Sequence, residues 1–229
     1  MTAESTIEIG RRLLEKCDLF SALDESSRRE LSSHGKRRTY PAGESICRIG
    51  DEGHTMMAVI VGAVRISITT SKGREMILAD LPAGQLFGEI AMFDGKPRSA
   101  HVTALTNCEL FVLERRDVLQ VLGKNPAACW KVIEILCARI RRSNERVAEI
   151  AFFDLPARLA RTLLEYPGQS RGPSKISLSQ RELAEMAGGT RENVNRCLRD
   201  WHKRGIVELK DRWTIILQPD ALRAMAADM

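Results

Sequence analysis

The chain has 229 residues, of which 44% are hydrophobic and 28% charged, a balance typical of a globular protein and not of a disordered one. Its length allows two domains with cores of their own. The formal net charge is +5, and residues 155–229 hold 13 Lys and Arg against 9 Asp and Glu. Most of the positive excess therefore lies in the last third of the chain, where it would attract phosphate groups.

No apolar run approaches the roughly 18 residues that a transmembrane helix needs, so we expect no membrane partner. The cysteines show no CxxC motif and no paired spacing, and no signal peptide precedes them. We therefore expect a protein of the reducing cytoplasm without a metal site. The cysteines are Cys17, Cys47, Cys108, Cys129, Cys137 and Cys197.

Residues 5–34 predict short helices, and the pattern then changes to short strands. Glycines recur between residues 41 and 95 and separate short apolar runs. Short strands with regular turn signals predict an antiparallel barrel or sandwich, which we place in a first domain of residues 1–120. The predicted strands include 56–61, 64–68, 76–78, 101–105 and 109–113.

Segment 87–100 combines residues that suit an anion. Gly88 lets the backbone approach a ligand closely, Arg98 adds a permanent cation, and Ser99 can donate one more hydrogen bond. Glu89 would repel a phosphate unless it binds another group, such as a sugar hydroxyl, and phosphate with ribose indicates a nucleotide. The alternative from these residues alone is a Glu89–Arg98 ion pair that closes the barrel rim. The candidate nucleotide site is Gly88, Glu89, Ile90, Arg98 and Ser99.

A long helix is predicted from Asp117 to about residue 151, and we take 121–153 as a dimerisation helix. Along it, seam residues recur at steps of four and three over about three heptads, the pattern of a coiled coil. This predicts a parallel homodimer; the alternative is one amphipathic helix packed on its own barrel. Ser143, with Asn144 beside it, is costly in such a seam unless it forms hydrogen bonds. The seam positions are Cys129, Ile133, Leu136, Ile140, Ser143, Val147 and Ile150.

Pro156 marks the end of the long helix, because the residue before a proline is disfavoured in the helical region. We place a further domain at residues 154–229. A hairpin after a helix-turn-helix is of the kind that forms a wing. The predicted elements are a helix at 156–166, a polar loop at 167–175, a helix-turn-helix at 178–201 and a hairpin at 206–217 with its tip at 210–212.

The segment 178–201 has the spacing of a helix-turn-helix. Ser179 and Glu182 form the pattern of a capping box at the start of the first helix. The pair Gly188–Gly189 supplies the unhindered turn that two steeply angled helices need, and Thr190 is the N-cap of the second helix. Its buried stripe is predicted to be Val194, Cys197, Leu198 and Trp201.

The opposite face of the second helix is polar and lies near the N-terminus, the part that a recognition helix presents to base edges in the major groove. An arginine suits guanine, and a glutamate suits the amino group of cytosine. Double-stranded DNA is thus the first candidate partner, and the alternative is a solvated helix face with an Arg–Glu pair. The candidate DNA-binding residues are Thr190, Arg191, Glu192, Asn195 and Arg196.

Three separated motifs resemble the cyclic-AMP receptor protein and fumarate-nitrate regulator (CRP/FNR) family of bacterial transcription regulators. Residues 88–89 with 98–100 look like the family's phosphate-binding cassette, and Arg191, Glu192 and Arg196 match its base-reading residues. The pair 143–144 falls where cyclic-AMP-binding members place a Thr or Ser followed by a Ser or Asn. The resemblance implies an α+β fold with an N-terminal antiparallel, jelly-roll-like β-roll, a long dimerisation helix and a C-terminal winged helix-turn-helix.

The resemblance also implies a mechanism. Cyclic AMP would bind with its ribose on Glu89, its phosphate on Arg98 and Ser99, and its base between Ser143 of one subunit and Asn144 of the other. A hinge at residues 153–154 would then reorient the DNA-reading heads of the homodimer. The DNA site would be an inverted repeat of half-sites similar to TGTGA, and RNA polymerase is an expected partner.

Other members of the family sense through an iron–sulfur cluster or haem, and neither is expected here. Cys17 and Cys47 are too few near the N-terminus for a cluster, and the histidines are scattered. An enzyme is disfavoured, since no catalytic triad, metal-ligand spacing or P-loop occurs. The remaining alternatives are a regulator of the same fold that responds to cyclic GMP or needs no ligand, and a nucleotide-binding module that acts on a protein partner.

Overall fold

The computed structural model describes residues 6–17, 20–70, 73, 75–166, 175–210 and 213–227. The chain divides into two compact units, one of Met1–Arg74 with Leu78–Ile140, and one of Glu75–Ile77 with Arg141–Met229. The fold class is α+β, as predicted from the sequence. Residues 167–174 of the predicted polar loop and 211–212 of the predicted hairpin tip lie outside the described residues.

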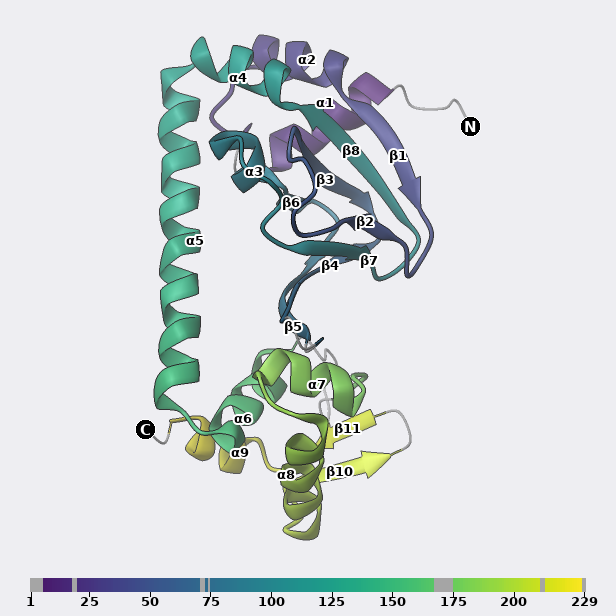
Figure 1. The fold of residues 1–229 in the computed structure, drawn as a ribbon, viewed down its shortest axis with the longest axis vertical. Coiled ribbons are helices and arrows are strands. Elements are labelled where there is room, and N and C mark those ends of the chain that lie inside the picture. Colours follow the sequence, from purple (N-terminus) through teal and green to yellow (C-terminus); the bar gives the residue numbers. More distant parts are fainter. Residues whose placement is uncertain are drawn as a thin grey trace. The chain divides into compact units, whose positions relative to one another are not determined.

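Within the described residues, the first unit contains two packed antiparallel sheets (Figure 1). Their strand orders are β1-β8-β3-β6 and β2-β7-β4-β5, so strands distant in sequence pair with each other, as in a jelly roll. The predicted antiparallel β architecture is confirmed. The strands are β1 Lys36–Tyr40, β2 Ser45–Cys47, β3 Thr55–Val61, β4 Ala63–Thr69, β5 Glu75–Pro82, β6 Leu86–Phe87, β7 His101–Ala104 and β8 Cys108–Glu114.

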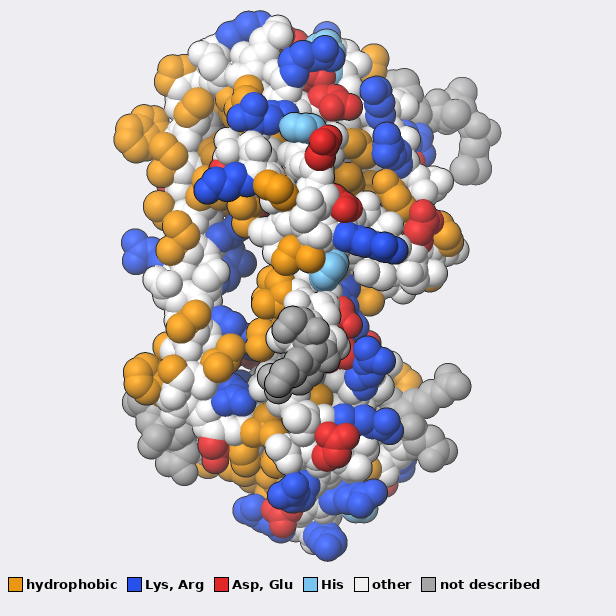
Figure 2. Space-filling model, in the orientation of Figure 1, with side chains coloured by type: hydrophobic (Ala, Val, Ile, Leu, Met, Phe, Trp, Pro, Cys, Tyr) orange, Lys and Arg blue, Asp and Glu red, His pale blue; other side chains and the backbone are white. Residues whose placement is uncertain are grey.

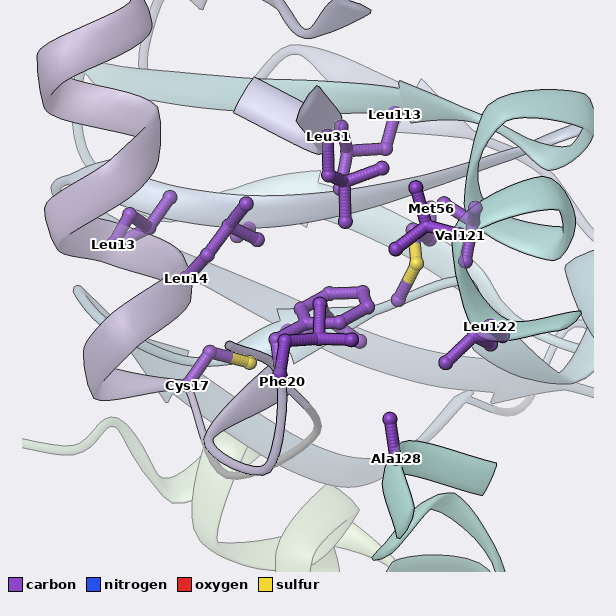
Figure 3. Packing of buried hydrophobic residues seen from close by; sticks show 14 of the residues in the cluster. Leu13, Leu14, Cys17, Phe20, Leu31, Met56, Leu113, Val121, Leu122 and Ala128 are labelled. Carbon is purple, nitrogen blue, oxygen red and sulfur yellow. The ribbon is translucent and has the colours of Figure 1, made fainter. Parts of the chain in front are cut away.

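The central strands β3 and β8 are buried on both faces, which explains why they are continuous apolar runs in the sequence. On β3, Met57 and Val59 belong to the core between the sheets. The alternating residues Met56 and Ala58 belong to a second core beneath the helices. This second core gathers side chains from α1, α2, α4 and the start of α5 (Figure 3). The helices are α1 Thr6–Lys16, α2 Glu25–His34, α3 Glu89–Asp94, α4 Arg115–Gly123 and α5 Pro126–Phe152.

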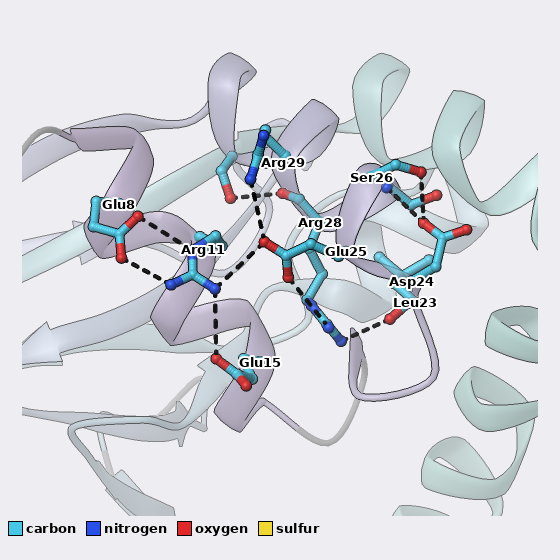
Figure 4. Close-up of polar contacts among 11 residues, drawn as sticks. Glu8, Arg11, Glu15, Leu23, Asp24, Glu25, Ser26, Arg28 and Arg29 are labelled. Carbon is cyan, nitrogen blue, oxygen red and sulfur yellow. Dashed lines mark hydrogen bonds and ion pairs between the residues drawn. The ribbon is translucent and has the colours of Figure 1, made fainter.

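Polar contacts fasten α1 to the start of α2 (Figure 4). Arg11 pairs with Glu8 at 2.8 Å and with Glu25 at 3.4 Å. Asp24 is the N-cap of α2, and its side chain accepts a hydrogen bond from the Ser27 backbone amide at 2.7 Å. That bond is the main reason why the pKa of Asp24 lies below its ordinary value. The two helices therefore cover the sheet as one layer.

Two glycines let these helices approach the sheet. A Cβ atom at Gly10 would lie 2.4 Å from the Phe111 ring, and one at Gly35 would lie 1.9 Å from it. Phe111 is fully buried on β8. The aromatic ring thus occupies the space that larger residues at these two positions would need.

We expect Gly35→Ala to destabilise the protein by about 1 to 3 kcal/mol, because the added methyl group overpacks the Phe111 ring. Chemical denaturation with a fluorescence or circular dichroism readout measures the change. Gly123→Ala is the matched control, since a Cβ atom there meets nothing within 4 Å. Equal stabilities of the two variants would contradict the assigned close packing.

Within the described residues, the second unit contains a helix-turn-helix and a small sheet with the strand order β10-β11-β9. The capping box at Ser179 and Glu182 forms as predicted, and Asp154 caps α6 just ahead of Pro156. The strands β10 and β11 form the predicted antiparallel hairpin. The elements are α6 Leu155–Glu165, β9 Lys175–Ile176, α7 Gln180–Ala187, α8 Arg191–Lys203, β10 Val207–Lys210, β11 Trp213–Ile216 and α9 Pro219–Ala227.

The helical stretch predicted from Asp117 onward is two helices, α4 and α5, because Pro126 starts a new helix at its first position. Within the first unit, one face of α5 packs on the core beneath the helices, with Val132 buried and Cys129 and Leu136 half-buried. Large apolar side chains are exposed elsewhere along α5 (Figure 2). No helix among the described residues is long and apolar enough to cross a membrane. The exposed apolar residues of α5 are Trp130, Ile133, Ile140, Val147, Ile150 and Phe152.

Candidate functional site

Gly88 joins strand β6 to the short helix α3 in a conformation that favours glycine, with φ at +83°. A Cβ atom there would lie 2.5 Å from Nη1 of Arg98 and 3.1 Å from the carbonyl oxygen of Thr55. Both the backbone angle and the available space therefore require glycine. The nearest side chain to this position is the candidate anion-binding Arg98.

Arg98 is a buried cation that pairs with no carboxylate among the described residues. Its side chain is 6% exposed. Nη1 donates to the Gly88 carbonyl oxygen at 3.1 Å, and Nη2 donates to Oγ1 of Thr55 at 2.8 Å. Nε is buried and has no hydrogen-bond partner in the part of the chain that the structure describes. A buried charge without a counter-charge costs several kcal/mol, so this guanidinium is suited to hold an anion.

The alternative of a Glu89–Arg98 ion pair is wrong, because Glu89 has a different partner. Glu89 is 2% exposed, and its Oε1 accepts a hydrogen bond from the guanidinium of Arg139 on α5. Arg139 also donates to the carbonyl oxygen of Leu86 at 3.0 Å. Sequence reasoning missed Arg139. The available signal was its position four residues before Ser143, on the same side of the helix.

The loop before β3 holds the backbone of Arg98. The Arg98 amide donates to the carbonyl oxygen of Asp51 at 2.8 Å, and the Gly50 amide donates to that of Arg98 at 2.9 Å. The same loop packs on α3, since a Cβ atom at Gly53 would lie 2.2 Å from the Cβ atom of Ala91. The guanidinium is therefore held on a fixed backbone.

The other predicted nucleotide-site residues are exposed. Ile90 lies on α3 and Ser99 directly after Arg98. Ser143 and Asn144 are exposed on α5 and belong to the second unit. The structure thus gathers Gly88 and Arg98 closely, with Glu89 beside them on α3.

The predicted DNA-binding residues lie in the first two turns of α8. Thr190 caps the helix, and its Oγ1 accepts from the Asn193 amide at 3.3 Å. Arg191, Glu192 and Arg196 are exposed. Of the predicted apolar stripe, Val194, Leu198 and Trp201 are buried, whereas Cys197 is only half-buried. Asn195 is half-buried, and its Oδ1 atom has no hydrogen-bond partner among the described residues. The polar and apolar faces of α8 are thus separated as a recognition helix requires.

Two cysteines lie near these sites. Burial raises the pKa of the Cys47 thiol, and Asp51 raises it further while Arg98 opposes the rise. Burial also raises the pKa of Cys197 on α8. Both side chains therefore remain protonated thiols at neutral pH, the less reactive form. Within the described residues, no group of three or more His, Cys, Asp or Glu is placed to hold a metal ion.

Comparisons with known proteins decide the family. Residues 37–125 match the cyclic nucleotide-binding domain, and residues 157–225 match the Crp-like helix-turn-helix domain. The cyclic AMP receptor protein of Thermus thermophilus is 34% identical over 77% of this chain and 82% of its own. The chain belongs to the CRP/FNR family. A CRP-like cAMP-activated global transcriptional regulator of Mycobacterium tuberculosis is 27% identical over 93% of this chain and 98% of its own.

Solved structures agree with the CRP/FNR fold. A putative crp/fnr-family regulator from Eubacterium rectale has a TM-score of 0.80 at 18% identity, covering 93% of this chain and all of its own. The Thermus thermophilus catabolite activator protein has a TM-score of 0.55 at 32% identity, covering 91% and 98%. The c-di-GMP responsive regulator CLP of Xanthomonas campestris has a TM-score of 0.75 at 24% identity, covering 84% and 99%.

The family fixes the broad function. This CRP/FNR chain is a transcription regulator with a cyclic-nucleotide-binding domain and a helix-turn-helix of a DNA-binding type, and it is not an enzyme. The predicted family, fold class and non-enzymatic role are confirmed. The members of this family are typically dimeric DNA binders.

We expect Arg139→Gln to destabilise the protein by about 2 kcal/mol, below the range for a fully buried pair because Arg139 is 35% exposed. The cause is the Glu89 carboxylate, which would remain buried without its partner. Adding Glu89→Gln should recover part of the loss, and denaturation of the wild type, both single variants and the double variant measures it. Strictly additive losses would show that the two side chains are not coupled.

Proposed function

We propose that this protein is a homodimeric bacterial transcription regulator gated by cyclic AMP, which binds inverted repeats of TGTGA-like half-sites. The observation that carries the proposal is the buried guanidinium of Arg98, whose charge no described carboxylate offsets. A cyclic phosphate supplies one negative charge and accepts several hydrogen bonds, which matches this donor set.

The residues around Arg98 account for the rest of a cyclic nucleotide. Ser99 is exposed directly after Arg98 and would donate to the phosphate, and Ile90 on α3 would flank the ligand. Oε1 of Glu89 accepts from Arg139, so the other carboxylate oxygen would serve a ribose hydroxyl. A carboxylate beside a phosphate is unfavourable unless a sugar hydroxyl uses it, and this favours a nucleotide over free phosphate.

The base would lie between the two subunits. Ser143 follows Arg139 by four residues, so it lies on the side of α5 from which Arg139 reaches Glu89. Asn144 follows Ile140 by four residues and precedes Val147 by three, so it lies among exposed apolar residues. We therefore assign Ser143 to the base bound in its own subunit and Asn144 to the base bound in the partner.

Homodimerisation would cover the exposed apolar side chains of α5. Ile133, Ile140 and Val147 follow one another at intervals of seven residues and are all exposed. Such a heptad interval is the pattern of a parallel coiled coil. Cys129 and Leu136 are half-buried on their own subunit, so the seam would be centred on the three exposed residues.

The second unit would read DNA through α8. The first turns of α8 carry the exposed residues Arg191, Glu192 and Arg196 and the half-buried Asn195. Thr190 caps the start of the helix. Two such helices in a dimer reach successive major grooves when they are about 34 Å apart. RNA polymerase is the further partner of this proposal, and the cytoplasm is its compartment.

Fluorescence anisotropy with a labelled TGTGA palindrome at fixed salt tests the proposal. The wild type should bind tightly with cyclic AMP and weakly without nucleotide, with cyclic GMP or with c-di-GMP. Arg98→Gln should fold normally but lose the response to cyclic AMP, because it removes the buried cation.

Any other result of the anisotropy experiment would change the function assigned to the protein or to Arg98. Equal wild-type binding under all conditions would support DNA binding through α8 and rule out gating by a nucleotide at Arg98. Tight binding with another nucleotide would change the ligand. Failure to bind any DNA would favour a module that acts on a protein partner. An unfolded Arg98→Gln variant would assign Arg98 to stability in place of ligand binding.

We expect Arg196→Ala to weaken binding to the palindrome by about 1 to 3 kcal/mol and to relax the preference at one base position. Competition with a set of single-base variants of the half-site measures the preference. Arg199→Ala is the matched control, since Arg199 is exposed on the same helix outside the reading set. An equal loss on every DNA sequence would show that Arg196 contacts phosphate and not a base.

A further inference from the structure

Two arginines hold the C-terminal end of α7, directly ahead of the helix that we propose to read DNA. The carbonyl oxygens of Met186, Ala187 and Gly188 each accept a hydrogen bond from a guanidinium. Arg146 on α5 donates to the first, and Arg158 on α6 donates to the other two at 2.9 and 3.4 Å. The last carbonyls of a helix lack intrahelical partners and carry partial negative charge, so cations stabilise them.

Arg158 also reaches the end of α5. Its Nη1 donates to the carbonyl oxygen of Phe153 at 2.5 Å, so three nitrogen atoms of one guanidinium bind three backbone carbonyls. These carbonyls belong to two places in the chain, the residue after α5 and the end of α7. Because a guanidinium is planar and rigid, it fixes the distance and the angle between the two.

A second layer of contacts holds this arrangement. Glu149 on α5 accepts from Arg146 at 3.4 Å and from Arg161 at 3.3 Å. Arg161 lies over the ring of Phe153, 3.7 Å from its centroid, and donates to the carbonyl oxygen of Ala226 at 2.8 Å. The last turns of α5, the helix α6 and the end of α9 are thereby joined by charged groups.

The turn between α7 and α8 is packed tightly against the start of α6. A Cβ atom at Gly189 would lie 2.6 Å from Cδ1 of Leu155, at the start of α6. Thr190, the next residue, is the N-cap of α8. The start of the recognition helix is therefore packed directly on the segment that follows α5.

We propose that Arg146 and Arg158 are positioning residues that lock α8 to the last turns of α5. A displacement of these turns is then passed to α8 and is not absorbed at residues 153–154, where the family resemblance implies a hinge. Arg158 is the central residue of this lock, since its guanidinium donates to backbone carbonyls both directly after α5 and at the end of α7. The inference rests on the proposed function only for its effect on DNA binding.

Hydrogen–deuterium exchange of the full-length protein tests the lock without DNA or nucleotide. Arg158→Gln should speed the exchange of backbone amides in residues 153–158 and 186–190 by about tenfold, because it removes charge-assisted hydrogen bonds. Amides of the first unit should keep their rates. Arg223→Gln is the matched control, since this exposed arginine of α9 pairs only with Asp220 in its own helix among the described contacts.

DNA binding then tests whether Arg158 transmits the effect of cyclic AMP from α5 to α8. With cyclic AMP and the labelled palindrome, Arg158→Gln should bind DNA about tenfold more weakly while its affinity for a fluorescent cyclic AMP analogue stays unchanged. Arg158→Lys should not restore DNA binding, because one ammonium cannot span three carbonyls. Arg146→Gln should speed exchange at residues 186–190 with a smaller DNA effect, since it removes one carbonyl contact there.

The outcomes separate this inference from the proposed function. Unchanged exchange at residues 186–190 in Arg158→Gln would overturn the lock, whatever the protein binds. Faster exchange there with wild-type DNA binding would overturn the role in signal transfer. A uniform rise in exchange over the whole chain would show that Arg158 acts on global stability instead. A wild type that binds no DNA refutes the proposed function. The exchange measurements, which need no DNA, would still test whether Arg158 holds the ends of α5 and α7 together.

Discussion

A buried positive charge governs the structure around segment 87–100. Arg98 is held by neutral acceptors, the carbonyl oxygen of Gly88 and the hydroxyl of Thr55, and no described carboxylate offsets its charge. Burial of such a cation is unfavourable, so the surrounding chain must be rigid to keep it inside. The positive φ of Gly88, the loop that bonds the Arg98 backbone and the packing of Gly53 on α3 supply that rigidity.

The neighbouring buried charge, the carboxylate of Glu89, does have a counter-charge. Glu89 is as deeply buried, but its counter-charge comes from Arg139 on α5. The short helix α3 therefore starts between two guanidinium groups, one fixed in the sheet region and one carried by the long helix. An anion at Arg98 would change the field at Glu89 and so the strength with which Glu89 holds α5, which gives α5 a physical reason to respond to a ligand.

Local patterns in the sequence predicted local structure well. The capping box of α7, the glycine turn and the apolar stripe of α8 all depend on residues within a few positions of one another. Arg139 was not predictable, since its partner Glu89 lies 50 residues away in sequence and only the fold brings them together. The heptad pattern also did not show that Cys129 and Leu136 pack against the core of the first unit. Periodicity shows that a helix face is apolar but not which surface covers it.

The pairing of β1 with β8 has a consequence for biosynthesis. Lys36 lies opposite Val112, so the earliest strand of the sandwich obtains its partner only after nearly the whole domain has been translated. Until then β1 and β3 also lack β8 between them, and the apolar faces of β3 stay open to water. Such long-range pairing slows folding and exposes nascent chains to aggregation. The sandwich can therefore close only after residue 114 has left the ribosomal exit tunnel.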